Sequence, residues 1–176
     1  QASALELDTI IHDLNAILDV KKGIHHAYEN INLENSFEKV KGILKDKIAE
    51  SNTTIYESFE AKTGYAIPAY IESIFYNLLS NAIKYRHPQR KPVIAIKTFI
   101  QDNTLMITVS DNGIGIDLKQ LKNKVFSLYQ RFHHHVEGKG MGLFLVKTQV
   151  EALDGSIDVH STVDEGSTFE IRIPIK

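Results

Sequence analysis

From residue 69 onward, the apolar residues switch between the spacing of a helix and the alternation of a strand. Steps of three and four predict helices over 69–85 and 141–153. Period-two runs after each helix predict strands at 93–100, 105–110, 156–161 and 167–174. Because two strands follow each helix, the order favours an α+β fold in which helices cover one face of a sheet.

Shorter elements precede this region. We expect a strand at 31–33, a helix at 35–50, a strand at 53–59 and a loop at 64–68. The complete prediction is a two-layer α/β sandwich with a mixed sheet, and the helices at 35–50, 69–85 and 141–153 share one face. The polar, weakly periodic connection over 117–137 is long enough to be functional, and we interpret it as a lid over the open face.

The N-terminal segment has a different character. Between Leu5 and about Lys22 the apolar residues recur at alternating steps of three and four, which predicts a helix that ends near Gly23. This spacing is close to the 3.5-residue repeat of helices that pack side by side, so we expect a helical hairpin or dimer bundle. We therefore divide the chain into a helical segment, 1–28, and a main domain, 29–176.

Composition excludes several classes of function. Among 176 residues, 20 Lys and Arg oppose 22 Asp and Glu, so no global basic field attracts nucleic acid or an anionic membrane surface. The absence of cysteine rules out disulfides, a thiol nucleophile and Cys-ligated zinc. No apolar run approaches the roughly 20 residues that span a bilayer, and no signal peptide is recognisable. We expect a cytoplasmic chain without membrane contact.

The first chemical motif is Asp111-Asn112-Gly113-Ile114-Gly115, directly after an apolar strand. Here a carboxylate can be held against the core while two glycines allow backbone to approach a flat ligand closely. An exocyclic amino group such as that of adenine would satisfy the carboxylate. The alternative is an Asp-Asn-Gly turn that only ends the strand.

The second motif, Gly138-Lys139-Gly140-Met141-Gly142, opens the helix predicted from Met141. Backbone N–H groups and the positive end of a helix converge there, and phosphate is the natural ligand. The alternative is a flexible linker before a helix. The spacing matches neither a P-loop nor the G-x-G-x-x-G of a dinucleotide fold.

The third motif is a polar stripe on the helix at 69–85. Asn77, Asn81 and Lys84 lie at spacings of four and three, so two amides and an ammonium share one face. An amide oxygen is a hard, neutral ligand for Mg²⁺ that already bridges phosphates, and lysine adds charge for the phosphates. The alternative is a solvated surface.

In this order, the motifs resemble the ATP-binding catalytic domain of sensor histidine kinases. That domain belongs to the wider group of gyrase-type, heat-shock-type and mismatch-repair ATPases, whose fold is called the Bergerat fold. The resemblance spans about Ile31 to Ile175. Its segments are an N box at Asn77–Tyr85, a G1 box at Asp111–Gly115, an F box at Phe126–Phe132, a G2 box at Gly138–Gly142 and a last glycine motif at Gly166–Phe169.

The resemblance implies ATP and Mg²⁺ as ligands and a role for individual residues. Asp111 would bind the adenine amino group, with Thr168 nearby through water, and Asn81 would coordinate Mg²⁺. The implied nucleotide-binding residues are Asn77, Asn81, Lys84, Tyr85, Asp111, Gly113, Gly115, Lys139, Gly140, Gly142, Leu143 and Thr168. The implied catalytic residues are Asn77, Lys84 and Arg131, and Arg131 or Lys139 would reach the γ-phosphoryl group.

Position 77 separates two activities. The hydrolytic relatives carry a glutamate there as a general base for water, whereas histidine kinases usually carry asparagine. Because an amide has no useful basicity near neutral pH, Asn77 favours transfer of the phosphoryl group over hydrolysis. The resemblance further implies a homodimer through the N-terminal helix and a response-regulator receiver domain as partner. The alternatives are a hydrolytic relative and a non-catalytic ATP-sensing dimerisation module.

Histidines outside these motifs receive other interpretations. His12-Asp13-Leu14 superficially resembles a phosphoacceptor box, but only one helix separates it from the main domain. We therefore interpret the N-terminal helix as the end of the second dimerisation helix, with the acceptor elsewhere. His133–His135 are adjacent and converge poorly on one metal ion, so a solvated lid segment is favoured.

A small basic cluster follows the helix at 69–85. One member could contact phosphate, but we interpret most of the cluster as solvated surface at the helix end. The cluster comprises Lys84, Arg86, His87, Arg90 and Lys91.

Overall fold

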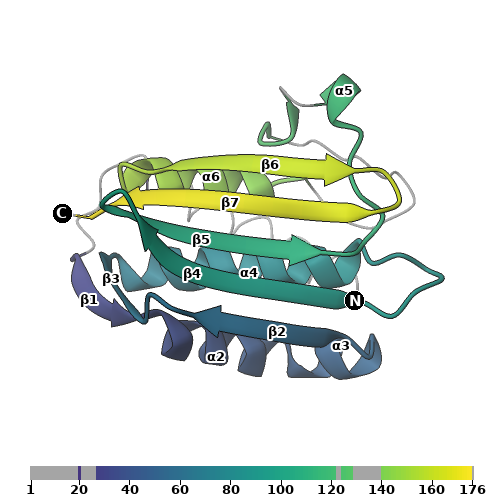
Figure 1. Ribbon diagram of the computed structural model, residues 1–176, viewed down its shortest axis with the longest axis horizontal. Coiled ribbons are helices and arrows are strands. Elements are labelled where there is room, and N and C mark those ends of the chain that lie inside the picture. Colours follow the sequence, from purple (N-terminus) through teal and green to yellow (C-terminus); the bar gives the residue numbers. More distant parts are fainter. Residues whose placement is uncertain (1–19, 21–26, 122–123, 129–139, 176) are drawn as a thin grey trace, which may run out of the picture.

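The computed structural model describes residues 20, 27–121, 124–128 and 140–175 (Figure 1). The helix predicted at 5–22 lies outside these residues, apart from the helical and partly buried Val20. His12, His133–His135 and most of the predicted lid also lie outside them, although α5 (Leu118–Leu121) occupies its beginning.

A five-stranded mixed sheet forms one layer of the domain. Its strand order is β2-β4-β5-β7-β6, and only the β2–β4 pair is parallel. The strands are β2 (Thr54–Phe59), β4 (Val93–Gln101), β5 (Thr104–Asp111), β6 (Ser156–Thr162) and β7 (Gly166–Pro174). A separate antiparallel pair joins β1 (Glu29–Asn32) to β3 (Thr63–Ala66).

Helices form the second layer, on one face of the sheet (Figure 1). They are α2 (Leu33–Ile43), α4 (Pro68–Lys84) and α6 (Gly142–Ala152), with the short α3 (Lys45–Glu50) after α2. The two-layer α/β sandwich with a mixed sheet is confirmed. Among the described residues, none of the helices has the length and apolar character needed to cross a membrane.

The core lies between the two layers because alternate strand residues point toward the helices. Ile107 of β5 and Ile171 of β7 are fully buried there, opposite Ile74 of α4 and Val146 of α6. Pro68 occupies the first turn of α4, where its missing N–H costs no hydrogen bond. The predicted helix at 69–85 and strand at 105–110 therefore form almost as expected.

Two predicted elements differ from the structure. The helix predicted over 35–50 is interrupted at Leu44, whose φ of −95° and ψ of 7° leave the helical geometry while its side chain is buried. The loop predicted at 64–68 begins as strand β3, because Thr63–Ala66 pair with β1. Asn32 ends β1 and caps α2 by accepting a 2.8 Å hydrogen bond from Asn35 N–H.

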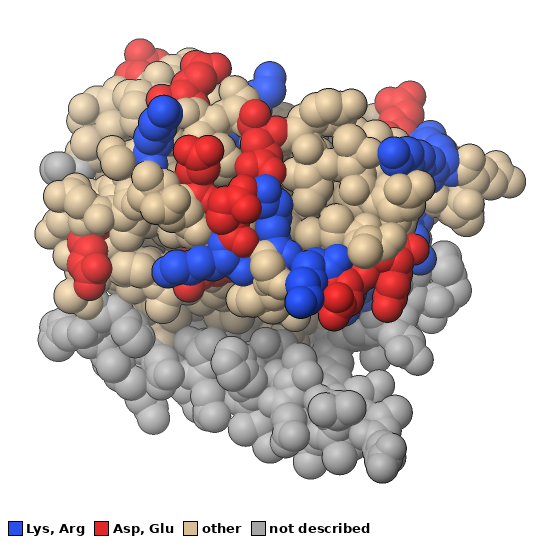
Figure 2. Space-filling view, turned by 90° about the horizontal axis from the view of Figure 1, so that it is seen from below, with Lys and Arg blue, Asp and Glu red and all other residues tan. Residues whose placement is uncertain are grey.

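Charges are mixed on the face that includes the β2 edge. Figure 2 shows basic and acidic side chains interspersed there, and no large patch of one sign is visible. Lys41 forms ion pairs with Glu38 and Glu57, and Lys39 pairs with Glu72 at 2.9 Å. The Lys39–Glu72 pair, whose lysine is well exposed, contributes at most about 1 kcal/mol.

Candidate functional site

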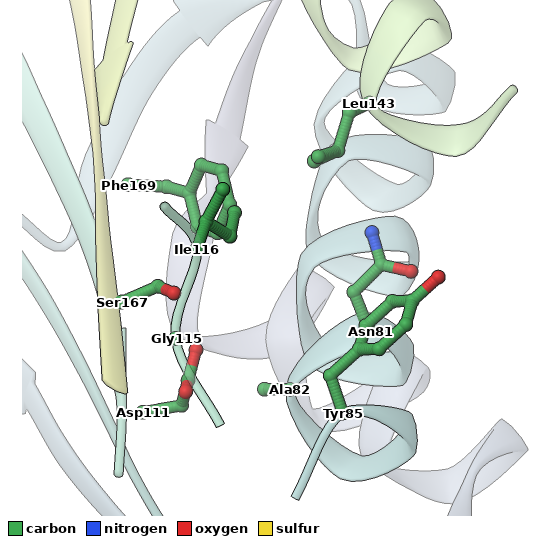
Figure 3. A pocket seen from close by; sticks show the side chains of 9 residues that line it. All are labelled: Asn81, Ala82, Tyr85, Asp111, Gly115, Ile116, Leu143, Ser167 and Phe169. Carbon is green, nitrogen blue, oxygen red and sulfur yellow. The ribbon is translucent and has the colours of Figure 1, made fainter. Parts of the chain in front are cut away.

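A hollow opens between the helix layer and one end of the sheet (Figure 3). Its volume is about 420 Å³, including the part open to solvent. Asp111 and Phe169 come from the sheet side, and Asn81 comes from α4 on the opposite side. The full lining is Asn81, Ala82, Tyr85, Asp111, Gly115, Ile116, Leu143, Ser167 and Phe169.

Asp111 is the one carboxylate among these lining residues. It ends β5, between its partners Ile94 of β4 and Ser167 of β7. Burial raises the pKa of Asp111 from 3.8 to about 6, although hydrogen bonds from the Gly113 and Ser167 backbones act in the opposite direction. The Gly113 N–H donates to Asp111 Oδ1 at 2.8 Å. A partly desolvated acceptor of this kind suits an amino group on a ligand.

The loop after Asp111 is threaded through a narrow space. A Cβ on Gly113 would fall on the carbonyl oxygen of Tyr85, at the end of α4. Gly115 has a φ of +70°, and a Cβ there would fall on the carbonyl oxygen of Thr162. Both positions therefore require glycine, as the motif predicted, because no side chain fits between the loop and its neighbours.

The polar stripe on α4 lies along the helix side of the site. Asn81 lines the hollow directly, and Lys84 Nζ lies 4.8 Å from the centroid of the Tyr85 ring. Asn77 Nδ2 donates to the Ser73 carbonyl at 2.9 Å, and a Cβ on Gly142 would lie 2.7 Å from Asn77 Oδ1. The structure thus brings the start of α6 onto the stripe, where a side chain at 142 would crowd Asn77.

Apolar side chains form the rest of the wall. Ile116 and Leu143 line the hollow together with Phe169, whose ring meets that of Phe126 edge to face with centroids 6.4 Å apart. An apolar wall with a few convergent polar groups is typical of a site for a planar organic ligand. The predicted Leu143 is therefore among the lining residues.

Two neighbouring hydroxyl residues of β7 lie differently relative to the hollow. Thr168 does not line the hollow, and its hydroxyl lies 2.9 Å from that of Ser110 on the other face of the sheet. Ser167, which we did not predict, lines the hollow because it shares the face of the buried Phe169. The period-two alternation of β7 was the signal that would have identified it.

The remaining predicted residues fall into two groups. Gly140 is described and has a φ of +68°, a conformation that favours glycine. Arg131 and Lys139 lie outside the described residues. Among the described residues, no three His, Asp or Glu side chains are grouped to hold a metal ion. The one predicted metal ligand, Asn81, presents a neutral amide, which fits an ion whose other ligands are phosphates and water.

Comparison with known proteins places this arrangement in a family. Residues 66–176, more than half of the chain, match the family described as histidine kinase-, DNA gyrase B-, and HSP90-like ATPase. The chain belongs to that family.

Two curated relatives are informative. Sensor protein RprX of Bacteroides fragilis is 30% identical over an alignment 188 residues long, which covers 93% of this chain and 36% of RprX. Sensor histidine kinase AtsR of Burkholderia thailandensis is 39% identical over 111 residues, which cover 60% of this chain and 18% of AtsR. The chain thus spans about a third or less of the length of these relatives.

A solved structure, full-length ShkA in complex with AMPPNP, has a similar fold. It superposes with a TM-score of 0.84 at 18% sequence identity, over 99% of this chain and 37% of ShkA. The fold is the Bergerat fold of histidine kinase catalytic domains, as expected, and the named relatives of the chain include sensor histidine kinases.

Proposed function

We propose that the chain is the ATP-binding catalytic portion of a two-component sensor histidine kinase. It binds ATP with Mg²⁺ and transfers the γ-phosphoryl group to a histidine of a dimerisation domain. The observation that carries the proposal is the position of Asp111, a half-buried carboxylate in an otherwise mostly apolar hollow. Family membership and the AMPPNP bound to ShkA support it.

Adenine fits the chemistry of the Asp111 end of the hollow. The base would stack against the apolar wall that includes Ile116 and Phe169, and its exocyclic amino group would donate to the Asp111 carboxylate. Guanine carries a carbonyl oxygen at that position, which a carboxylate would repel. The site is therefore expected to prefer adenine nucleotides.

The phosphates would extend along α4 toward the start of α6. We assign Asn81 as a Mg²⁺ ligand, and Lys84 and Tyr85 as contacts to phosphate or ribose. Gly140, Gly142 and Lys139 would approach the triphosphate from the glycine-rich segment, and Arg131 would reach the γ-phosphoryl group. When bound, Mg²⁺ neutralises charge on the phosphates during transfer.

Asn77 favours phosphoryl transfer over hydrolysis. Its amide cannot remove a proton from water, so the site lacks at this position the base that a hydrolytic enzyme uses. In the proposed reaction, the bond between the γ-phosphorus and the bridging oxygen of ADP breaks while a bond to the imidazole nitrogen forms. The protein contributes mainly by positioning the reactants and stabilising charge.

The proposal extends to the whole protein. The segment 1–28 would be the end of the dimerisation hairpin and 29–176 the catalytic domain, so the protein would act as a homodimer. The phosphoryl group would pass from histidine to an aspartate of a response-regulator receiver domain. We place this reaction in the cytoplasm, whether or not the complete protein has a membrane anchor, and expect neither nucleic acid nor membrane to bind the chain.

A titration with AMPPNP in the presence of Mg²⁺ tests nucleotide binding, with calorimetry of the wild type and of Asp111→Asn. Asp102→Asn, which removes the same charge in the exposed β4–β5 turn, is the matched control. We expect micromolar to submillimolar binding for the wild type and the control, and loss of binding in Asp111→Asn. A wild type that binds no nucleotide would refute the proposal.

Transfer is tested separately. The chain is incubated with radiolabelled ATP and a histidine-bearing dimerisation domain from a related kinase, and acid-labile phosphohistidine is measured. We expect label on the supplied domain. Nucleotide binding without transfer would favour the non-catalytic sensing module, and release of phosphate to water would favour the hydrolytic alternative.

A further inference from the structure

Arg90, in the connection between α4 and β4, lies where three segments of the chain meet. Its Nε donates to the Asn112 carbonyl at 2.8 Å, and its Nη2 donates to the Gly113 carbonyl at 2.9 Å. The same Nη2 also donates to the carbonyl of Asp164, in the turn between β6 and β7. One edge of the guanidinium thus joins the loop after Asp111 to a turn about 50 residues further along the chain.

Other contacts hold the loop on different sides. The Asn112 side chain accepts from Val93 N–H at 2.8 Å and donates to the Lys91 carbonyl at 3.0 Å. The Asp164 N–H donates to the Ile114 carbonyl at 2.9 Å. Arg90 alone among these groups brings a positive charge to the point where three carbonyl oxygens converge. It offsets the mutual repulsion of their negative ends.

The turn that Arg90 contacts has an uncommon backbone. Asp164 has a φ of +64°, in the left-handed region that few residues other than glycine adopt. His87 Nε2, from the same connection as Arg90, lies 3.8 Å from Asp164 Oδ1. Arg90 and His87, both from the α4–β4 connection, therefore contact the same residue, Asp164. The β6–β7 turn that contains Asp164 also lies beside Gly115, which lines the hollow.

We propose that Arg90 is a positioning residue for recognition of the adenine base. It does not line the hollow, and it acts by holding the carbonyls of Asn112, Gly113 and Asp164 together. The Asp111 carboxylate then meets its ligand in a loop that is already ordered, which lowers the entropic cost of binding. This inference rests on the proposed binding of ATP.

Arginine is required for this role because two adjacent N–H groups of its guanidinium can donate to the successive carbonyls of Asn112 and Gly113. The Nε and Nη2 atoms donate in parallel from one rigid plane, whereas a lysine ammonium is a single point charge on a flexible stem. Arg90→Lys keeps the charge and loses the fork. It therefore separates the geometric role of Arg90 from a general attraction of phosphate.

The binding test compares Mg-ADP with Mg-GDP. Arg90→Ala and Arg90→Lys are each expected to raise the Kd for ADP about tenfold, or about 1.4 kcal/mol. The Kd for GDP should change little, so the preference for adenine shrinks. Lys91→Ala is the matched control, because Lys91 holds Asn112 through its main-chain carbonyl, and this variant should behave as wild type.

Hydrogen exchange of the nucleotide-free protein tests the loop without any ligand. Both Arg90 variants should accelerate exchange of the Gly113, Ile114 and Asp164 amides, while amides in the centre of β5 keep their protection. Unchanged exchange in a folded Arg90→Lys protein would overturn the inference even if nucleotide binds. If the Arg90 variants exchange faster but the wild type binds no nucleotide, the proposed function is refuted, and Arg90 has a structural role only.

Discussion

Replacing Asp111 with asparagine should stabilise the nucleotide-free protein while it removes nucleotide binding. Burial raises the pKa of Asp111 from 3.8 to about 6. Because one pK unit corresponds to 1.36 kcal/mol, keeping this group charged in the folded protein costs roughly 3 kcal/mol at pH 7.5. Asparagine is neutral and its oxygen still accepts from the Gly113 N–H. We expect Asp111→Asn to raise the free energy of unfolding by about 1–3 kcal/mol.

The pH dependence has a definite sign. The folded protein binds a proton at Asp111 more tightly than the unfolded chain does, so the cost is fully present above about pH 7. It falls as the pH drops through 6 and vanishes below 3.8, and near pH 5 about half of it remains. The stability advantage of the variant should shrink in the same way.

Urea denaturation of the wild type and Asp111→Asn at pH 7.5 and pH 5 measures both effects. Asp102→Asn serves again as the control for the change in net charge, and its difference from wild type should stay within about 0.5 kcal/mol. A variant that is less stable than wild type at pH 7.5, or an advantage that is equal at both pH values, would refute the reasoning. Stabilisation together with lost binding is the pattern of a site that sacrifices stability for function.

Three further predictions concern the same site. The Kd of the wild type for Mg-ADP, measured by calorimetry, should rise as the pH falls below about 6 and approach a tenfold rise per pH unit. The reason is that a protonated Asp111 no longer offers a carboxylate to the ligand. A Kd that is flat from pH 7.5 to 5 would contradict this prediction. Gly115→Ala should lower the free energy of unfolding by about 3 kcal/mol or more, since φ is +70° there and the added Cβ would overlap the Thr162 carbonyl oxygen. Gly42→Ala, in open space on α2, should instead raise it by about 0.5–1 kcal/mol. Urea denaturation gives both values, and equal effects would argue against strain at Gly115. Ser167→Val should weaken Mg-ADP binding about fivefold and Thr168→Val should not, because of these two residues only Ser167 lines the hollow. Weaker binding in Thr168→Val with unchanged binding in Ser167→Val would instead support the role of Thr168 that the motif predicted.

Much of the fold could be predicted because its signals are local. The helix at 69–85 and the strands at 93–100 and 105–110 each carry their own apolar period, and the structure places them within one or two residues of those limits. Periodicity reports which face of an element is buried without any knowledge of its partner. The carboxylate of Asp111 could be identified similarly, because it follows a buried strand directly.

The misses concern contacts between distant segments. Residues 63–66 have no strong strand pattern and become β3 only because β1 pairs with them. Ser167 is a miss of another kind, because the alternation of β7 already puts it on the buried face of Phe169 and Ile171, whereas the resemblance named Thr168. Arg90 is exposed, in keeping with a surface position, but its contacts could not be predicted, since its three carbonyl partners are 22, 23 and 74 residues away.

The amino-acid sequence by itself determined the class of fold, the family and the residue types that the site needs. Helical and strand periods are set by neighbouring residues. The spacing of the glycines and of Asn77, Asn81 and Lys84 can also be read directly along the sequence. The tertiary structure alone decided that Gly142 packs against Asn77 and that Arg90 holds the loop after Asp111. These are distances between segments far apart in the chain, and they exist only once the sheet has brought those segments together.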